Sequence, residues 1–438
     1  MLKLRVSIIQ AKRSVIVILI TILLSDCGVN TSVPVSTLGI TPTFPSSLPT
    51  ATMPLPAPPL TSTPTPSLPI SSAPDELRIA YVIDGNLYFQ VGSKPAVQLT
   101  NSGEDWHISF FSEDGEKIFF LRGITSYNLY SINVDGSQEK VLVTNDILRT
   151  LGEEYDEESM ICHINLVPNT HILLFQTCFY PELNNHNLLD GNNELLAVDG
   201  DTGDIKKILP PGRVRDYHIS PDGQLLAIHA KGHVDLFDIN GEVIRRNLIT
   251  YTSSEPIYIP PDVHWMQDSN GLIVVLPLQT FFDTSGGAPN YTIWRYALDG
   301  SPGAQVHLDP MPRDLVKVSP DGNWVIFHDE RGALYIGDLR NGSSQSYEPR
   351  PGFSLYEWSP DSRYFIYGGV DLYRVSTNAS PVFIDKGDFI GWLDANRFLY
   401  ISGKTIVMGS VDGEKKAILS DVYEVFRENI FFTFVLVN

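Results

Sequence analysis

The chain has 438 residues, and 43% of them are hydrophobic, which provides enough apolar side chains for a large core. Its formal net charge is −20, from 51 acidic and 31 basic residues. Nucleic acids and anionic membranes are bound by clustered lysine and arginine, and the sequence shows no such clusters. We therefore expect no nucleic-acid partner, and we interpret the acidity mainly as a source of solubility.

Residues 1–26 have the pattern of a signal peptide. A basic segment that ends at Arg13 precedes an apolar run over residues 15–24. That run is too short for a permanent transmembrane helix, which needs roughly 20 apolar residues. We therefore expect the chain to be exported.

The residues that follow the apolar run, Leu24-Ser25-Asp26-Cys27, resemble a bacterial lipobox. In proteins with that motif the cysteine becomes the lipidated first residue of the mature chain. The resemblance implies lipidation at Cys27 and a position in the cell envelope, anchored to the membrane and facing outside the cytoplasm. Asp26 departs from the motif, which has a small neutral residue there. Ordinary signal cleavage and an uncleaved signal anchor are therefore alternatives.

Residues 27–74 are rich in proline, serine and threonine, with no charged residue between Gly28 and Pro74. Such a composition cannot build a core, and its prolines favour extended conformations. We expect a disordered tether here, followed by a single domain over residues 75–438.

Two cysteines lie inside the expected domain. If residues 168–170 form a hairpin turn, Cys162 and Cys178 lie nearly opposite each other on paired strands. A disulfide can persist in an exported protein and would contribute about 3 kcal/mol by closing so short a loop. Two unbonded buried thiols are the alternative.

From residue 75 onward, short alternating or aromatic-rich runs are separated by Gly, Asp and Asn, which is typical of β-strands. Seven of these runs follow a turn related to Ser319-Pro320-Asp321-Gly322. The seven units that contain the turn are residues 108–122, 164–177, 218–230, 264–277, 317–329, 357–369 and 391–402. Each unit continues with further strands and spans about 40 residues, which predicts a four-stranded β-propeller blade.

The two ends of the domain supply one more blade. Residues 77–100 contain three strands of a blade but no first strand, and residues 421–438 can provide the missing one. A shared blade closes the ring and removes the open sheet edges. We therefore predict an all-β fold, a β-propeller with eight blades, and keep seven blades as the alternative.

The turn Trp358-Ser359-Pro360-Asp361 resembles the repeat of TolB-type, WD-repeat-like propellers, and the resemblance covers roughly residues 75–438. It implies a propeller fold but no particular chemistry, because this group includes partner-binding proteins and the accessory domains of peptidases. TolB has an additional α/β domain and the peptidases have a catalytic domain, and this chain shows neither.

The repeated serine is a candidate nucleophile only in appearance. Ser, Pro, Asp and Gly suit the successive positions of a type I turn. The serine is replaced by Val167, Met266 and Leu393 in other units. We therefore interpret the turn as structural and predict no catalytic residue.

A column of polar residues precedes the turns. Its members are Asn165, His218, His264, Lys317 and Glu357. If this strand is the innermost of each blade, the column forms a candidate ligand-binding ring at the propeller axis. Hydrogen bonding between neighbouring blades is the alternative role, since Phe110 and Gly391 interrupt the ring. Two histidines and a distant carboxylate do not define a metal site, so we assign no metal and no cofactor.

Three links are longer than the others and are candidates for recognition, because rigid scaffolds often bind through their long loops. They are residues 147–160, which are strongly acidic, and residues 180–192 and 277–292. We expect the acidic link to be a solvated loop, with a contact for a basic partner or a loosely held cation as the alternative.

These features together favour a monomeric, non-catalytic propeller, tethered in the envelope, that binds a protein, peptide or glycan. The alternative from another class is a propeller hydrolase or lyase with an axial site, which could be metal-dependent. A purely structural role as a spacer or assembly subunit is a third interpretation.

Overall fold

A computed structural model shows how the chain folds. It describes residues 76–92, 94–123, 128–152, 155, 159–179, 190–230, 232–251, 261–277, 290–347, 355–368, 371–376, 379–419 and 432–437. The residues from Asp75 onward form one compact unit. The predicted signal peptide, Cys27 and the tether lie outside the described residues.

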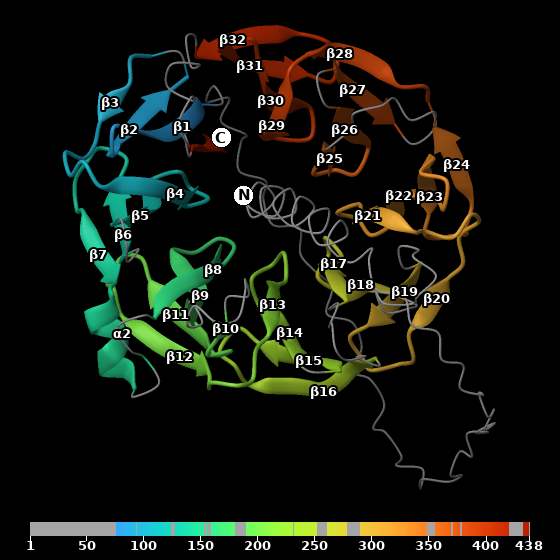
Figure 1. The fold of residues 1–438 in the computed structure, drawn as a ribbon, viewed down its shortest axis with the longest axis horizontal. Helices are drawn as coiled ribbons and strands as arrows, with labels where there is room; N and C mark the ends of the chain where they lie inside the picture. Colours follow the sequence, from blue (N-terminus) through green and yellow to red (C-terminus); the bar gives the residue numbers. More distant parts are fainter. Residues whose placement is uncertain are drawn as a thin grey trace, which may run out of the picture. The chain divides into compact units, whose positions relative to one another are not determined.

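The described strands form a ring of eight four-stranded antiparallel blades (Figure 1). The eight-blade prediction is therefore confirmed. In seven blades the first strand is innermost and the others follow outward in chain order. Blade two comprises β4 (Asp105–Phe111), β5 (Lys117–Arg122), β6 (Asn128–Asn133) and β7 (Lys140–Val143). Blade three comprises β8 (Met160–Leu166), β9 (Ile172–Phe179), β11 (Leu195–Asp199) and β12 (Ile205–Leu209), and the short β10 (Asp190–Gly191) also pairs with β9. Blade four comprises β13 (Asp216–Ile219), β14 (Leu225–Ala230), β15 (His233–Asp238) and β16 (Val243–Thr250).

The other four complete blades continue around the ring (Figure 1). Blade five comprises β17 (Asp262–Trp265), β18 (Gly271–Pro277), β19 (Tyr291–Ala297) and β20 (Ala304–Val306), and blade six comprises β21 (Asp314–Val318), β22 (Trp324–His328), β23 (Leu334–Asp338) and β24 (Ser344–Tyr347). Blade seven comprises β25 (Leu355–Trp358), β26 (Tyr364–Gly368), β27 (Asp371–Ser376) and β28 (Val382–Lys386). Blade eight comprises β29 (Asp388–Trp392), β30 (Arg397–Ser402), β31 (Thr405–Ser410) and β32 (Lys415–Leu419).

The first blade is built from both ends of the domain, as the sequence predicted. Its strands are β1 (Glu76–Ile83), β2 (Asn86–Val91), β3 (Val97–Gln98) and, from the C-terminus, β33 (Phe432–Val437), in the order β3-β2-β1-β33. The C-terminal strand supplies the missing innermost position and contacts the inner strand β4 of the next blade. On the other side, a Cβ placed on Gly391 would lie 2.9 Å from Cζ of Phe434. One strand therefore closes the ring against both neighbours.

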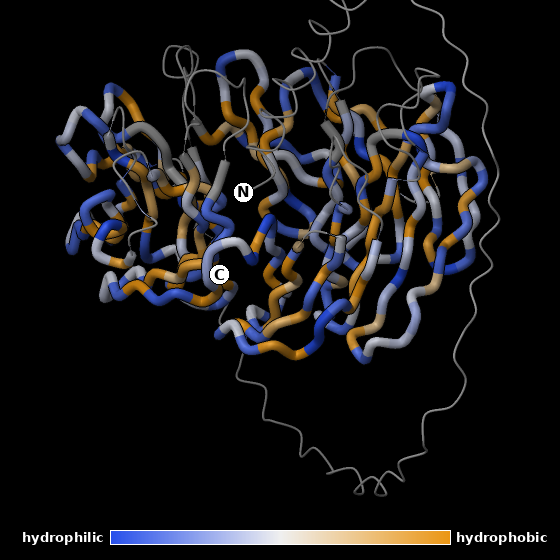
Figure 2. Tube along the Cα trace, turned by 60° about the horizontal axis from the view of Figure 1, so that its bottom comes forward, coloured by the Kyte–Doolittle hydropathy of each residue, from blue (hydrophilic) through white to orange (hydrophobic). Residues whose placement is uncertain are grey.

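The core lies within and between the blades. The second strand of a blade is covered on both faces, and Phe119, Phe175, Phe327, Phe365 and Phe398 on such strands are fully buried. Figure 2 shows hydrophobic strand segments inside the blades, while the outermost strand β16 is mostly exposed. Phe119 packs with Phe175 of the following blade in one cluster. Each buried aromatic contributes about 1.5–3 kcal/mol through burial, so the seams between blades supply much of the stability.

The repeated turn is held by its own side chains. In four blades the serine hydroxyl donates to the aspartate two residues later and accepts from the backbone N–H five residues later. These serines are Ser112, Ser220, Ser319 and Ser359, with Oγ–Oδ1 distances of 2.5, 2.5, 2.6 and 2.7 Å. Gly322 has a positive φ of 68°, a conformation that suits glycine. The hydroxyl is therefore used within the turn, which agrees with a structural role for the serine.

The acidic link differs from the prediction of a solvated loop, since it begins as a helix. α2 (Asn145–Leu151) starts after Thr144, whose side chain accepts a hydrogen bond from the backbone N–H of Ile147 at 3.1 Å. Leu148 is buried, and this apolar anchor explains why the link turns back onto the blades. The acidic residues themselves lie outside the described part: Glu153, Glu154, Asp156, Glu157 and Glu158.

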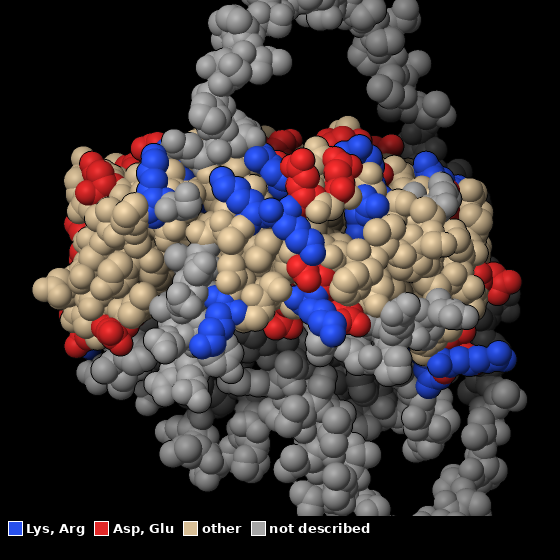
Figure 3. Space-filling view, turned by 90° about the horizontal axis from the view of Figure 1, so that it is seen from above, with Lys and Arg blue, Asp and Glu red and all other residues tan. Residues whose placement is uncertain are grey.

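The outer edge of the ring carries both charge signs. Figure 3 looks onto the edge that is uppermost in Figure 1 and shows basic and acidic side chains next to each other. Lys415, on the outermost strand β32, pairs with Asp385 of β28 at 2.8 Å. This edge therefore has no patch of a single sign. None of the described helices is long and apolar enough to span a membrane.

Candidate functional site at the axis

Strand direction gives the ring two different ends. Within a blade, the turns that join the first strand to the second and the third to the fourth lie at one end, which we call the turn end. The links from the second strand to the third, and from one blade to the next, lie at the other end, which we call the link end. All three predicted recognition links, residues 147–160, 180–192 and 277–292, therefore connect strands at the link end. Most of their residues lie outside the described part.

The structure places the predicted polar column on the innermost strands of five successive blades. Asn165 is on β8, His218 on β13, His264 on β17, Lys317 on β21 and Glu357 on β25. These strands stand closest to the centre of the ring (Figure 1), and all five residues are half-buried. The placement at the axis agrees with the sequence analysis, and the ligand-binding role remains a prediction.

The column also joins neighbouring blades. Three indole nitrogens on inner strands donate to backbone carbonyls of column residues in the preceding blade. The pairs are Trp265 with His218 at 3.0 Å, Trp358 with Lys317 at 3.1 Å, and Trp392 with Glu357 at 3.3 Å. The Tyr217 hydroxyl of the next blade donates to the backbone carbonyls of His163 and, at 2.9 Å, Leu174. Bonding between blades therefore uses mainly the backbone of the column.

Aspartate begins five of the inner strands, a feature that the sequence analysis missed. These residues are Asp105, Asp216, Asp262, Asp314 and Asp388. Because the inner strands all run from the link end to the turn end, their first residues lie at the link end of the axis. Asp105 is fully buried and forms an ion pair with Arg122 at 2.5 Å. The side chains of Asp216 and Asp262 are 45% and 53% exposed and remain accessible.

Three ionisable residues share one face of the fourth blade. Asp216 is paired with His229 of β14, so the two lie on the same face, and His218 follows two residues after Asp216. Nε2 of His218 lies 3.9 Å from Oδ2 of Asp216, and the rings of His218 and His229 are 5.1 Å apart. His229 is 1% exposed, and neither of its ring nitrogens has a hydrogen-bond partner among the described residues.

The environment of His229 keeps it neutral. Burial lowers the pKa of His229, and the nearby His218 lowers it further. Asp216 and Asp262 act in the opposite direction but do not compensate. A neutral imidazole has one acceptor and one donor nitrogen, and both are unused here.

The next inner strand, β17, repeats the Asp-x-His pattern. Nε2 of His264 lies 3.0 Å from Oδ2 of Asp262. Desolvation by the surrounding protein raises the pKa of Asp262, but His264, with His218 and Lys317 farther away, lowers it overall. Asp262 is therefore charged at neutral pH. We call Asp216, His218, His229, Asp262 and His264 the axial cluster.

The axial cluster does not have the arrangement of a metal site. Within the described part of the chain, no three His, Cys, Asp or Glu side chains are placed to hold a metal ion. The cluster instead offers a ligand several hydrogen-bonding groups, mounted on strands that cannot easily move.

The two cysteines lie on paired strands, as the sequence predicted, but they are not opposite each other. The register places Cys178 opposite Met160, and Cys162 opposite Gln176. The pairing register of β8 with β9 also shifts between Cys162 and Asn165. The structure contains no disulfide between these two cysteines, so the predicted bond is not formed.

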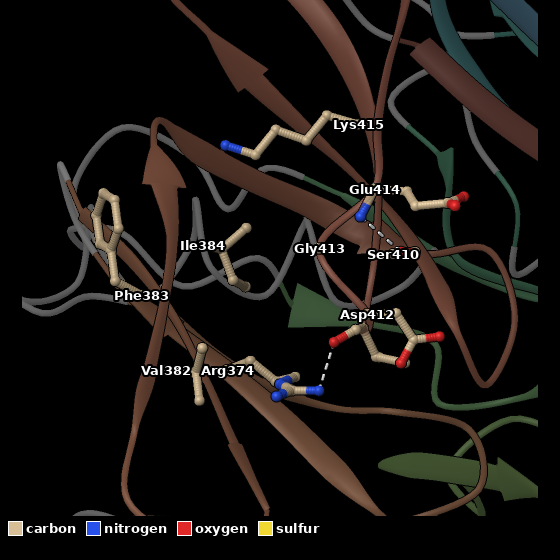
Figure 4. Close-up of a pocket in the computed structure, with 10 residues that line it drawn as sticks. Arg374, Val382, Phe383, Ile384, Ser410, Asp412, Gly413, Glu414 and Lys415 are labelled. Atoms are coloured by element: carbon tan, nitrogen blue, oxygen red, sulfur yellow. Dashed lines mark hydrogen bonds between the residues drawn. The ribbon is translucent and has the colours of Figure 1, made fainter.

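A separate pocket lies at the outer edge, away from the axis. It has a volume of about 230 Å³ and lies between β28 and the turn from β31 to β32. Figure 4 shows Phe383 and Val382 on one side of it and Asp412 on the other, with Arg374 hydrogen-bonded to the carbonyl of Val411. Phe383 is 51% exposed. The polar residues Ser410, Asp412, Glu414 and Lys415 also line the pocket.

Comparisons with known proteins support the fold. No family model matches the sequence, and no curated protein matches it. Among solved structures, a eukaryotic initiation factor is 13% identical, with 79% of this chain and 85% of that chain covered and a TM-score of 0.52. AztD from Citrobacter koseri is 11% identical, with 83% of this chain and 98% of that chain covered and a lower TM-score of 0.46. TolB from Acinetobacter baumannii is 12% identical, with 82% of this chain and 66% of that chain covered and a TM-score of 0.33. Likeness at such identities shows a β-propeller fold alone.

Proposed function

We propose that this chain is an envelope-tethered β-propeller that binds a protein, peptide or glycan partner at the link end of its axis, without catalysis. The observation that carries the proposal is the axial cluster. Two successive inner strands carry Asp-x-His pairs, and the buried His229, which has no hydrogen bond among the described residues, lies opposite the first aspartate.

The fold itself does not require these side chains. A buried polar group without a hydrogen bond costs about 1–3 kcal/mol, so such groups call for an explanation outside packing. At the alternate positions of β17, Val263 and Trp265 pack against the preceding blade as ordinary core residues. The polar positions lie on rigid strands, at the end from which the long links leave, which suits a preorganised binding site.

The tether belongs to the same proposal. It is supported by the basic and apolar residues before Cys27 and by the uncharged, proline-rich residues 28–74. Membrane fractionation should place the wild type with membranes and release Cys27→Ala, and mass spectrometry of the N-terminus should find the lipid on wild type alone. A soluble, unmodified wild type would refute the anchor without affecting the axial site.

The binding site can be tested by photo-crosslinking from the full-length chain in the cells that make it. A photoreactive residue at Arg213, exposed at the link end of the fourth blade, should give a discrete crosslinked product. The matched control is Asn240, exposed at the turn end of the same blade, which should give none. No product from Arg213, or the same product from both positions, would contradict the proposal.

A propeller hydrolase or lyase is the second candidate, and the 3.0 Å contact between Asp262 and His264 favours it. A carboxylate beside an imidazole is an arrangement used in general acid–base catalysis. If this candidate is correct, mass spectrometry of the crosslinked partner should find it cleaved by wild type and intact with Asp262→Asn. An intact partner in both cases would favour binding alone.

A further inference from the structure

We propose that the axial cluster binds a primary ammonium or guanidinium group, carried by a lysine or arginine side chain of a partner or by a free polyamine. This inference deepens the proposed function and rests on it for the position of the site. It adds the chemical class of the ligand, which favours a basic peptide segment over a glycan.

The hydrogen-bonding groups of the cluster are mostly acceptors. The carboxylates of Asp216 and Asp262 only accept hydrogen bonds when ionised, and the neutral imidazole of His229 can accept one. Ammonium and guanidinium groups are the complement, because they carry three and five N–H donors and no acceptor. Charge-assisted hydrogen bonds to carboxylates are also about twice as strong as neutral ones.

The charge of the site points to the same class. Both carboxylates are about half exposed, while the nearest column cation, Lys317, stands one blade farther along. The link end of the axis also holds Asp388, which is exposed at the start of β29. Of the five inner-strand aspartates, Asp105 is neutralised by the arginine beside it. Asp216, Asp262 and Asp388 are therefore accessible acceptors at the link end, where the exposed Arg213 and Arg215 precede Asp216 in the chain.

The groups are close enough to act on one ligand. β13 and β17 are neighbouring inner strands in contact with each other. The charge of Asp262 influences His229 in the preceding blade, and His218 influences Asp262 in return. A single cation between the two strands is therefore within reach of both Asp-x-His pairs.

His229 is an independent sign of a ligand at this position. It is 1% exposed, its ring lies against that of His218, and it has no hydrogen bond on either nitrogen in the described structure. A cationic imidazole at this position would repel a bound cation. Its buried position keeps the ring uncharged, so the back of the site offers a neutral polar surface.

The test is calorimetric titration of the full-length protein in detergent at pH 7.5. The probes are tetralysine, the same peptide with every side chain acetylated, and spermidine. Tetralysine should bind, and its acetylated form should bind at least tenfold more weakly because it has lost the charges. If spermidine binds as tightly as tetralysine, the source is a free polyamine; if tetralysine binds tighter, it is a peptide.

The variant Asp216→Asn/Asp262→Asn should weaken tetralysine binding at least tenfold. The control Asp412→Asn/Glu414→Gln removes the same charge from an exposed turn at the turn end and should change affinity less than twofold. If the first double variant unfolds, Asp262→Asn alone replaces it, since this side chain is more than half exposed. His218→Phe, which keeps a ring but removes the acceptor, should weaken binding at least threefold.

The inference would be overturned by no tetralysine binding to the wild type, by equal binding of the acetylated peptide, or by equal weakening in the control. Preferential binding of an acidic oligosaccharide would do the same. The proposed function is judged separately, because crosslinking from Arg213 does not depend on these probes. A link-end crosslink without tetralysine binding would refute the inference and leave the proposed function standing.

Discussion

Replacing His171 should remove a pH-dependent bond between two blades. His171 lies at the turn end, just before β9, and bridges two carboxylates. Its Nδ1 is 2.9 Å from Oδ2 of Asp201, and its Nε2 is 3.1 Å from Oδ2 of Asp114, which belongs to the preceding blade. Lys117 of that blade pairs with Asp201 at 3.2 Å and completes the network.

The sign of the pH dependence follows from the shifted pKa values. Burial lowers the pKa of His171, but hydrogen bonds and charges from Asp201 and Asp114 raise it overall. Its charge therefore stabilises the fold fully below the unfolded pKa of about 6.5, and this contribution is lost as pH rises through the folded pKa. The pKa of both aspartates is lowered, so their contribution is lost only in acid, around and below about pH 4.

The magnitude is set by exposure. The side chain of His171 is 26% exposed, but those of Asp114 and Asp201 are 53% and 56% exposed, so solvent screens both contacts. Two such contacts at about 0.5–1 kcal/mol each give a loss of about 1–2 kcal/mol for His171→Gln at pH 5.5. At pH 9 the loss should be clearly smaller.

Urea denaturation at the two pH values measures the difference, provided that the m value stays constant. His307→Gln, at an exposed histidine, is the control and should change stability little at either pH. A loss from His171→Gln that is equal at both pH values, or larger at pH 9, would refute the reasoning, since the imidazolium would then not be the stabilising form.

Three further substitutions test how the ring is held together, all by urea denaturation. Ser319→Ala removes a buried hydroxyl bonded within its turn and should cost about 1–2 kcal/mol; an unchanged midpoint would mean that the hydroxyl is dispensable. Trp358→Phe removes the indole donor to the carbonyl of Lys317 and should cost about 1 kcal/mol, whereas a stabilised variant would contradict this. Gly391→Ala forces a Cβ against Phe434 and should lower the free energy of unfolding by about 1–3 kcal/mol. Adding Phe434→Leu should recover part of this loss. Purely additive effects of the two substitutions would show that the residues are not coupled.

The fold was predictable because each blade repeats the same physical solution. A turn with serine, aspartate and glycine precedes a strand covered on both faces, and this combination leaves a strong periodic signal in the sequence. Even the shared blade could be inferred, since residues 77–100 lacked an inner strand and β33 was available to supply it. The helix α2 was missed because its two turns, anchored by Leu148, are too short to show a helical period.

The aspartates of the axial site were missed because β-bulges alter their spacing. Asp216 and Asp262 stand four residues before the turn positions Ser220 and Met266, whereas Asp314 stands five before Ser319. The extra residue corresponds to a register shift between Asp314 and Lys317, and β29 has a similar shift after Asp388. Counted along the chain, the aspartates therefore do not align, although four of them occupy the same place opposite the second strand.

Two histidines show how stability and recognition are divided between the ends of the ring. At the turn end, His171 has both nitrogens bonded to carboxylates, and its raised pKa reports a group that holds blades together. At the axis, toward the link end, His229 is more deeply buried, but neither of its nitrogens is bonded within the part of the chain that the structure describes, and its pKa is lowered. Packing explains the first arrangement and not the second, because an unbonded buried imidazole weakens the fold. The unmet hydrogen-bonding capacity lies beside accessible carboxylates on rigid strands, which is why the search for a ligand should begin there.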